Sequence, residues 1–361
     1  MQIITVYTLD IVSVLKYNII VANKCSSKLE DNMIKIENLT KVFKKPIRQE
    51  GVLGMLKTLF SAKYEEIFAV NHINVDIADG EIVGYIGSNG AGKSTTIKMM
   101  CGILTPTEGK VLVDGVEPYK NRRKVASNIG VVFGQKTQLW WDIPLIESFK
   151  VLKEIYQISD ADYKERMDFL CDTLGIRDFL SQAVRTLSLG QRMRADLAAA
   201  WLHNPKILFL DEPTIGLDVL VKERIRQAIK AMNAKYHTTV ILTTHDMQDI
   251  EDLCSRIVII ENGGIIYDGA LSTIKHRFGD LRTVTVSPKV DYTVDGLDTF
   301  DGKVSYEVQE SNLLIKFNAD DIAMEQVVDY AFHTLKSADL KVSEITIEDV
   351  VRSILQEQET K

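Results

Sequence analysis

The sequence has few cysteines, and their spacing excludes the common metal-binding motifs. Its four cysteines are scattered along the chain, and no two of them form a CxxC or similar ligand pair. Because the sequence also has no secretory signal, we expect reduced, packed thiols in a cytosolic protein. Their positions are Cys25, Cys101, Cys171 and Cys254.

Long apolar runs are missing as well. The most apolar stretch, residues 1–22, is interrupted by Asp10, Lys16 and Asn18, whereas a membrane-spanning helix needs about 20 mostly apolar residues. The stretch also lacks the basic start and the small-residue cleavage site of a signal peptide. We therefore expect neither a transmembrane helix nor a signal peptide in this stretch. Since a strand pattern opens at Met33, our hypothesis is that residues 1–32 are an extension upstream of the natural start.

An excess of positive charge is absent too. The net charge of −7 disfavours duplex DNA as the main partner, and we expect no nucleic-acid partner. About 45% of the residues are apolar and 26% are charged, which is typical of a globular protein rather than a disordered one. A chain of 361 residues has room for one large domain and a smaller one.

Residues 33–278 alternate between strand-like and helix-like segments. Apolar and polar residues alternate at 34–36 and 73–77, as in strands with one buried face. Continuous apolar runs, typical of a parallel sheet buried on both faces, follow at 82–86, 129–133, 207–210, 239–242 and 257–260. The helical, charged sequence after residue 141 predicts a helical subdomain, at about 142–190, inserted in an α/β core.

Two other segments differ from this core. Residues 44–64, KKPIRQEGVLGMLKTLFSAKY, form a basic insertion that we expect to be a solvated loop with a short helix rather than a lipid-binding helix. Residues 279–361 predict a small accessory C-terminal α+β domain. Its expected strands lie at 283–286, 304–308, 313–317 and 340–345, and its expected helices at 322–337 and 347–355.

The most specific motif is a phosphate-binding loop. Residues 87–94, GSNGAGKS, match GxxxxGK[ST] at each fixed position, between a predicted strand and a predicted helix at 95–101. Glycines let the loop wrap closely round a phosphate, and we expect Lys93 to reach the β- and γ-phosphates and Ser94 to bind Mg²⁺. The predicted ATP contacts are Gly87, Ser88, Asn89, Gly90, Ala91, Gly92, Lys93, Ser94 and Thr95.

Two carboxylates follow the strand predicted at 207–210. Asp211 stands at the carboxyl end of that strand, where open α/β sheets bind ligands, and we expect it to hold Mg²⁺ directly or through water. Glu212 can orient and deprotonate the attacking water. Two acids before Pro213 would also suit a simple turn, but the P-loop favours the catalytic interpretation.

Four further motifs make the chain resemble the ATP-binding cassette (ABC) family. LSLGQ at 187–191 resembles the family's signature motif, PTIGLD at 213–218 its D-loop, THD at 244–246 its switch histidine and Gln135 its Q-loop. Together with the P-loop and the acidic strand, they cover most of residues 33–278. The resemblance implies a P-loop NTPase fold with an inserted helical subdomain, and an ATPase that uses Mg²⁺.

The resemblance also implies that ATP is bound between two copies of the chain. In the family, the signature closes on the γ-phosphate that the other subunit's P-loop holds, so we expect Ser188, Gly190 and Gln191 to contact ATP in a homodimer, at a helix N-terminus suited to anions. Asp218 of the D-loop is expected at the same site. Leu189 stands where the family usually has glycine, which puts the geometry of the signature in question.

Some roles depend wholly on the resemblance. It implies that His245 contacts the γ-phosphate, that Gln135 binds Mg²⁺ and senses the membrane partner, and that Phe43 stacks on adenine. Alone, these would suit a structural histidine, a surface glutamine and a core phenylalanine. Trp140 and Trp141 suit either an interface with the membrane subunit or core packing.

The implied function is the ATP-hydrolysing subunit of an ABC transporter, similar to those of ABC-2 type exporters, at the cytoplasmic face of the membrane beside a separate permease. An alternative is an ABC ATPase that remodels nucleic acid or ribosomes. Those proteins carry two cassettes or a long coiled-coil insertion, and this chain has one cassette and no heptad run. In a third possibility, residues 279–361 make the protein a ligand-sensing regulator.

Overall fold

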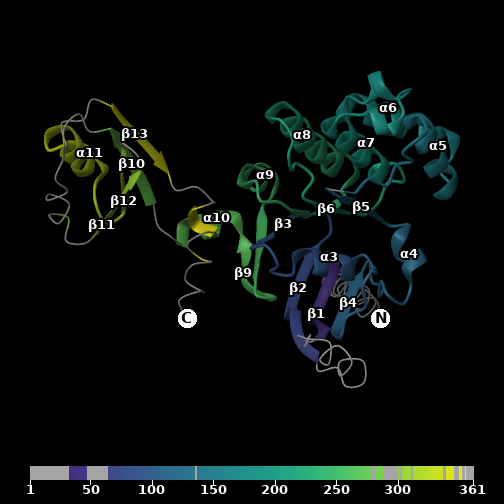
Figure 1. The fold of residues 1–361 in the computed structure, drawn as a ribbon, viewed down its shortest axis with the longest axis horizontal. Coiled ribbons are helices and arrows are strands. Elements are labelled where there is room, and N and C mark those ends of the chain that lie inside the picture. Colours follow the sequence, from purple (N-terminus) through teal and green to yellow (C-terminus); the bar gives the residue numbers. More distant parts are fainter. Residues whose placement is uncertain are drawn as a thin grey trace, which may run out of the picture.

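The computed structural model describes residues 32–46, 64–134, 136–277, 281–287, 300, 303–309, 312–335, 339–344, 349–351 and 354. The predicted extension at 1–32 therefore lies outside the described residues except for Asn32, as do residues 47–63 of the basic insertion and Gln135. Within the described ranges, the strands form three sheets (Figure 1).

The largest sheet has the strand order β5-β6-β7-β3-β8-β9. The first five strands are parallel, and β9 pairs antiparallel with β8. The continuous apolar runs are thus confirmed as neighbouring parallel strands, whereas β9 was not predicted. The strands are β3 (Ile82–Gly87), β5 (Ile129–Phe133), β6 (Ile207–Asp211), β7 (Thr239–Thr243), β8 (Arg256–Glu261) and β9 (Gly264–Ala270).

Alternate residues of each central strand enter two different cores. In β6, Leu208 and Leu210 pack with the helices on one face, whereas Ile207 and Phe209 pack in the core on the other face. All four side chains are fully buried. Because both faces of the sheet are covered, each position along the strand must be apolar, which explains the unbroken runs in the sequence.

One face is covered by α3 (Lys93–Met100) and by a second, antiparallel sheet of order β2-β1-β4. Its strands are β1 (Asn32–Pro46), β2 (Tyr64–Ala78) and β4 (Glu108–Val113). The expectation of a loop from residue 44 was wrong at both ends, because β1 continues to Pro46 and pairs it with Tyr64. Opposite charges across the pair, such as Lys44 and Glu66, favour this extension of the hairpin.

Helices cover the other face. Helix α4 (Arg122–Ala126) lies beside β5, and its Val125 packs in the core on the side of the second sheet. None of the described helices combines the length and apolarity that a membrane crossing requires. The second half of α7 packs closely on β5, since a Cβ on Gly130 would lie 2.4 Å from the carbonyl oxygen of Ala200. The helices are α5 (Leu145–Ile155), α6 (Asp160–Leu174), α7 (Leu189–Trp201), α8 (Val219–Tyr236) and α9 (Met247–Leu253).

The third sheet lies after residue 280, with the antiparallel order β11-β12-β10-β13 and α11 (Met324–His333) packed on it (Figure 1). The helix is shorter than the expected 322–337, because Ala323 has extended backbone. After this sheet, Val350, Val351 and Ile354 join Ile274 of α10 (Leu271–Arg277) in the helical core of the large sheet. The strands are β10 (Leu281–Ser287), β11 (Val304–Gln309), β12 (Asn312–Asn318) and β13 (Asp339–Glu344).

Candidate active site at the P-loop

The loop between β3 and α3 has a backbone suited to an anion. Gly90 and Gly92 have positive φ angles of 88° and 110°. Gly92 is the N-cap of α3, and a Cβ there would lie 2.3 Å from the carbonyl oxygen of Ala69. No side chain caps α3. The first N–H groups of the helix are therefore left without a capping side chain, as a helix end that receives a phosphate requires.

The lysine of this loop is folded back on it. Lys93 Nζ donates to the carbonyl oxygens of Gly87, at 2.6 Å, and Ser88, at 2.9 Å. Burial lowers the pKa of Lys93, whereas the charges of Glu212, Asp211 and Glu261 act in the opposite direction. The ammonium group thus lies among carboxylates at the entrance of the cradle, where a phosphate would meet it.

Glu261 is a partner of the loop that the sequence analysis missed. Its carboxylate accepts hydrogen bonds from the backbone N–H of Ser88, at 3.3 Å, and from the Ser88 hydroxyl, at 2.9 Å. The two residues are 173 positions apart, and they meet because β8, which ends at Glu261, pairs in parallel with β3. No local sequence pattern reports such a contact.

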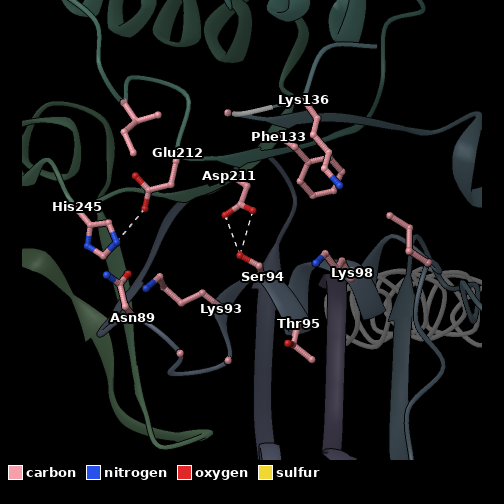
Figure 2. A pocket seen from close by; sticks show the side chains of 15 residues that line it. Asn89, Lys93, Ser94, Thr95, Lys98, Phe133, Lys136, Asp211, Glu212 and His245 are labelled. Carbon is pink, nitrogen blue, oxygen red and sulfur yellow. Dashed lines mark hydrogen bonds and ion pairs between the residues drawn. The ribbon is translucent and has the colours of Figure 1, made fainter. Parts of the chain in front are cut away.

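Hard oxygen ligands converge between α3 and β6. Ser94 Oγ lies 3.1 Å from Asp211 Oδ2 (Figure 2). Thr243 Oγ1 donates to Asp211 Oδ1 at 2.6 Å. A hydroxyl and a carboxylate of this kind are the ligands that Mg²⁺ accepts while it keeps several waters. The residues present therefore fit a magnesium ion at the P-loop, with Ser94 and Asp211 as its protein ligands.

Glu212 has an unusual backbone that its neighbours hold in place. Its φ angle is +57°, a conformation that a residue other than glycine rarely adopts without tertiary restraint. The Glu212 N–H donates to the carbonyl oxygen of Thr243 at 3.0 Å. On its other side, a Cβ on Gly134 would lie 2.4 Å from the Glu212 carbonyl oxygen. The residue before Gln135 is thus packed directly on the backbone of the acidic pair.

The Glu212 side chain faces His245. The distance from His245 Nε2 to Glu212 Oε1 is 3.3 Å (Figure 2). Burial raises the pKa of Glu212 above its ordinary value, although His245 and Lys93 act to lower it. A raised pKa lies closer to neutral pH and makes the carboxylate a stronger base. His245 is half exposed, so this side chain is open to a ligand in the cavity while it contacts Glu212.

Most of these groups line one cavity of about 710 Å³ (Figure 2). Of the predicted residues, it is lined by Asn89, Gly90, Gly92, Lys93, Ser94, Thr95, Asp211, Glu212 and His245. The cavity is also lined by residues that the sequence analysis did not single out: Lys98, Ile103, Phe133, Gly134, Lys136 and Ile215.

Other predicted residues do not line this cavity, namely Gly87, Ser88, Ala91, Phe43, Ser188, Gly190, Gln191 and Asp218. Phe43 is 42% exposed on β1, which excludes the core-packing interpretation. Ser188 caps α7: its hydroxyl accepts from the Gln191 N–H at 3.2 Å, and its own N–H donates to Gln191 Oε1 at 2.9 Å. The Gln191 N–H expected to bind phosphate is therefore already satisfied within the chain.

Two exposed tryptophans stand on the segment after Gln135. Trp140 and Trp141 are 40% and 47% exposed, which excludes core packing. The Arg192 guanidinium lies over the Trp141 ring, 5.6 Å from its centroid. One turn further along α7, the buried Asp196 carboxylate accepts from the Thr137 hydroxyl at 2.8 Å and from the Gln138 N–H at 3.1 Å. The tryptophan segment is thus attached to α7, the helix that Ser188 caps.

Comparison with known proteins agrees with this geometry. The family model described as ABC transporter matches residues 70–215. The ABC transporter ATP-binding protein NatA of Bacillus subtilis is 32% identical over 233 residues, which are 64% of this chain and 94% of NatA. The chain belongs to the ABC transporter ATP-binding family. As an ABC cassette, it binds ATP and is an ATPase.

The chain is also similar to other ABC proteins. The solved dimer of the cassette MJ0796, in a post-hydrolysis state with ADP and Pi, is 27% identical with a TM-score of 0.55, over 66% of this chain and 99% of that one. The mouse organic anion transporter ABCA8A is 29% identical over 318 residues, which are 84% of this chain and 19% of that longer protein. Other relatives, such as MetN 2 of Enterococcus faecalis, are named for methionine import.

Proposed function

We propose that this chain is the ATP-hydrolysing subunit of an ABC-2 type exporter, which works as a homodimer at the cytoplasmic face of the membrane and drives a separate permease. One observation carries the proposal. The P-loop, Asp211, Glu212 and His245 share a cavity that the signature of the same chain does not line. One chain therefore offers two separate parts of a nucleotide site.

Within the cavity, the residues divide the work on ATP. Lys93 and the N–H groups at the start of α3 hold the phosphates. Ser94 and Asp211 would hold Mg²⁺, which when bound neutralises charge on the phosphate oxygens. Glu212 accepts a proton from the water that attacks the γ-phosphate, and its pKa, raised by burial, suits that role. His245 contacts the γ-phosphate and orients the Glu212 carboxylate.

The second copy supplies the signature. Ser188 caps α7 and Gly190 lies in its first turn, and these residues are exposed or partly exposed, so a phosphate held by another chain can approach this helix end. The dimeric state of the related cassette MJ0796 supports the same arrangement here. ATP then becomes part of the interface between the two chains, and its hydrolysis weakens that interface.

The permease is proposed to dock on the tryptophan segment. Trp140 and Trp141 are exposed aromatic side chains of the kind that protein interfaces use. Asp196 and Arg192 attach this segment to α7. A partner that binds the tryptophans can therefore shift α7, the helix that carries the signature.

Export rather than import is proposed because the single cassette and its extra C-terminal domain resemble the ATP-binding subunits of ABC-2 type exporters. The alignment with ABCA8A takes in 84% of the chain, more than residues 1–278 could supply, so it extends into the small C-terminal sheet. A relative named as an organic anion transporter thus shares sequence with part of the accessory segment. The import names of other relatives make direction the property to measure.

Proteoliposomes that contain the chain and a permease that co-purifies with it would test this function. We expect the permease to stimulate ATP hydrolysis and substrate to move away from the side that holds the cassette. Replacement of both Trp140 and Trp141 by alanine should remove the stimulation but keep basal turnover within about twofold. Phe332→Ala, at a similarly exposed aromatic residue on α11, is the matched control. Unchanged stimulation in the tryptophan variant, or movement towards the cassette side, would contradict the proposal.

A further inference from the structure

A buried carboxylate behind the active site joins the two loops that carry Glu212 and His245. Asp249 of α9 has no exposed surface. Its Oδ2 atom accepts hydrogen bonds from two threonine hydroxyls, Thr214 Oγ1 at 2.5 Å and Thr244 Oγ1 at 3.1 Å. Thr214 lies two residues after Glu212, and Thr244 lies directly before His245. One oxygen atom therefore holds both loops.

The charge of Asp249 is balanced by one arginine. Arg226 of α8 donates from Nη1 to Asp249 Oδ1 at 3.0 Å, and its guanidinium also pairs with Asp252 and Glu223. A buried carboxylate without a partner would be costly, and here each oxygen of Asp249 has its own donor. The two sides of the carboxylate are thus committed to different partners, the threonine hydroxyls on one and the guanidinium on the other.

The joined loops need such a restraint. Glu212 has a φ angle of +57°, and residues in sparsely populated conformations persist only where the surrounding structure holds them. Thr243 and Gly134 hold Glu212 from the sheet side, and Asp249 holds the chain after it through Thr214. A second cavity, of about 400 Å³, separates these loops at the surface and is lined by both threonines, Glu212 and His245. Without Asp249, no described contact would tie Thr214 to Thr244.

We infer that Asp249 is a positioning residue for ATP hydrolysis, which fixes the Glu212 carboxylate against His245 by holding Thr214 and Thr244 on one oxygen. The inference rests on the proposed roles of Glu212 and His245. Asp249 itself does not touch the nucleotide cavity. Its loss should therefore leave Mg·ATP binding intact and slow turnover, since misplacement of a catalytic group by about 1 Å can cost roughly a hundredfold in rate.

The substitution Asp249→Asn tests this inference with little change in volume. Asparagine has one acceptor oxygen and one NH₂ donor, so it cannot accept from both the threonines and Arg226. We expect kcat to fall at least about tenfold, while KM and the Kd for the fluorescent analogue TNP-ATP stay within about twofold. Asp252→Asn is the matched control, because it removes a carboxylate from Arg226 but leaves both threonine contacts, and its kcat should stay within about twofold.

Variants of Thr214 test the same inference if the Asp249 variant does not fold. Thr214→Val removes the hydroxyl at nearly constant volume and should lower kcat with little change in KM, whereas Thr214→Ser keeps the hydroxyl and should restore turnover. Equal turnover of Thr214→Val and wild type, equal losses in the Asp249 and Asp252 variants, or a parallel loss of TNP-ATP binding would overturn the inference. If the wild-type chain itself does not hydrolyse ATP in this series, the proposed function fails instead.

Discussion

The first turns of α3 and α7 are both expected to meet the same ATP phosphates, but they differ in how their N–H groups are satisfied. The N-cap of α3 is Gly92, which offers no side chain, and the helix begins inside the cavity. The N-cap of α7 is Ser188, which forms a reciprocal capping box with Gln191. One helix end has no capping side chain, and the other has a side chain that already satisfies the Gln191 N–H.

This difference indicates an order of events. A helix end without a cap gains most from an anion, so the P-loop of a single chain can bind ATP first. The α7 end needs an anion less in a single chain, because its capping box already satisfies two backbone N–H groups. It contributes only when a second copy brings a phosphate to the exposed Ser188.

The largest expected effect is a difference in ATP affinity of the isolated chain between variants of the two helix ends. Lys93→Ala should weaken Mg·ATP binding to the isolated chain by about a hundredfold or more, because it removes the charge that meets the phosphates. Ser188→Arg should leave the affinity of the isolated chain within about twofold yet abolish steady-state hydrolysis. Calorimetric titration with ATP and a phosphate-release assay measure the two properties. Equal losses of ATP affinity in both variants would contradict the proposed difference between the α3 and α7 ends.

Mixing those two variants tests whether the helix ends act on each other across chains. A dimer of one Lys93→Ala chain and one Ser188→Arg chain keeps one composite site with both parts intact. We expect the mixture to recover up to about half of the wild-type turnover per dimer, while each variant alone is inactive. Phosphate release from tagged, purified heterodimers is the measurement. An inactive heterodimer would argue against assembly in trans or show that the two sites hydrolyse only together.

The two N-cap residues should differ in their tolerance of alanine. At Gly92, a Cβ would lie 2.3 Å from the Ala69 carbonyl oxygen at a φ angle of 110°, so Gly92→Ala should cost about 2 kcal/mol or more. Ser188→Ala removes only a cap and should cost about 1 kcal/mol. Urea unfolding of both variants, without nucleotide, compares them. A Ser188→Ala variant that is the less stable of the two would contradict this account.

The smallest expected effect concerns Asp196, which gives α7 a buried carboxylate that α3 lacks. Burial raises the pKa of Asp196 to about 6, above its unfolded value of about 3.9. The folded state therefore binds this proton more tightly, and the contribution of Asp196 to stability falls as pH rises from about 4 to about 6. Asp196→Asn should remove that slope and be more stable than wild type at pH 7 by on the order of 1 kcal/mol. A difference between the two that does not vary with pH would refute the assigned pKa.

The sequence predicted what depends on local pattern. The runs of Val and Ile predicted the central strands because both faces of that sheet are covered, and GSNGAGKS predicted the cradle because only its glycines allow that backbone. The contacts of Glu261, Asp196 and Asp249 could not be predicted, since each arises from pairing or packing between distant segments. The charged end of β1 was mistaken for a loop, because cross-strand pairing with β2 neutralises charges that look solvated in one strand alone.

The central claim is that nucleotide completes a site between two chains. Glu212→Gln should bind Mg·ATP but stall hydrolysis, so that the ATP-bound dimer accumulates. Light scattering of this variant, with and without saturating Mg·ATP, measures the claim most directly. The account predicts a shift from the single-chain mass of 40.7 kDa to twice that value, which ADP in place of ATP does not produce. A variant that binds one ATP per chain and keeps the single-chain mass would contradict it.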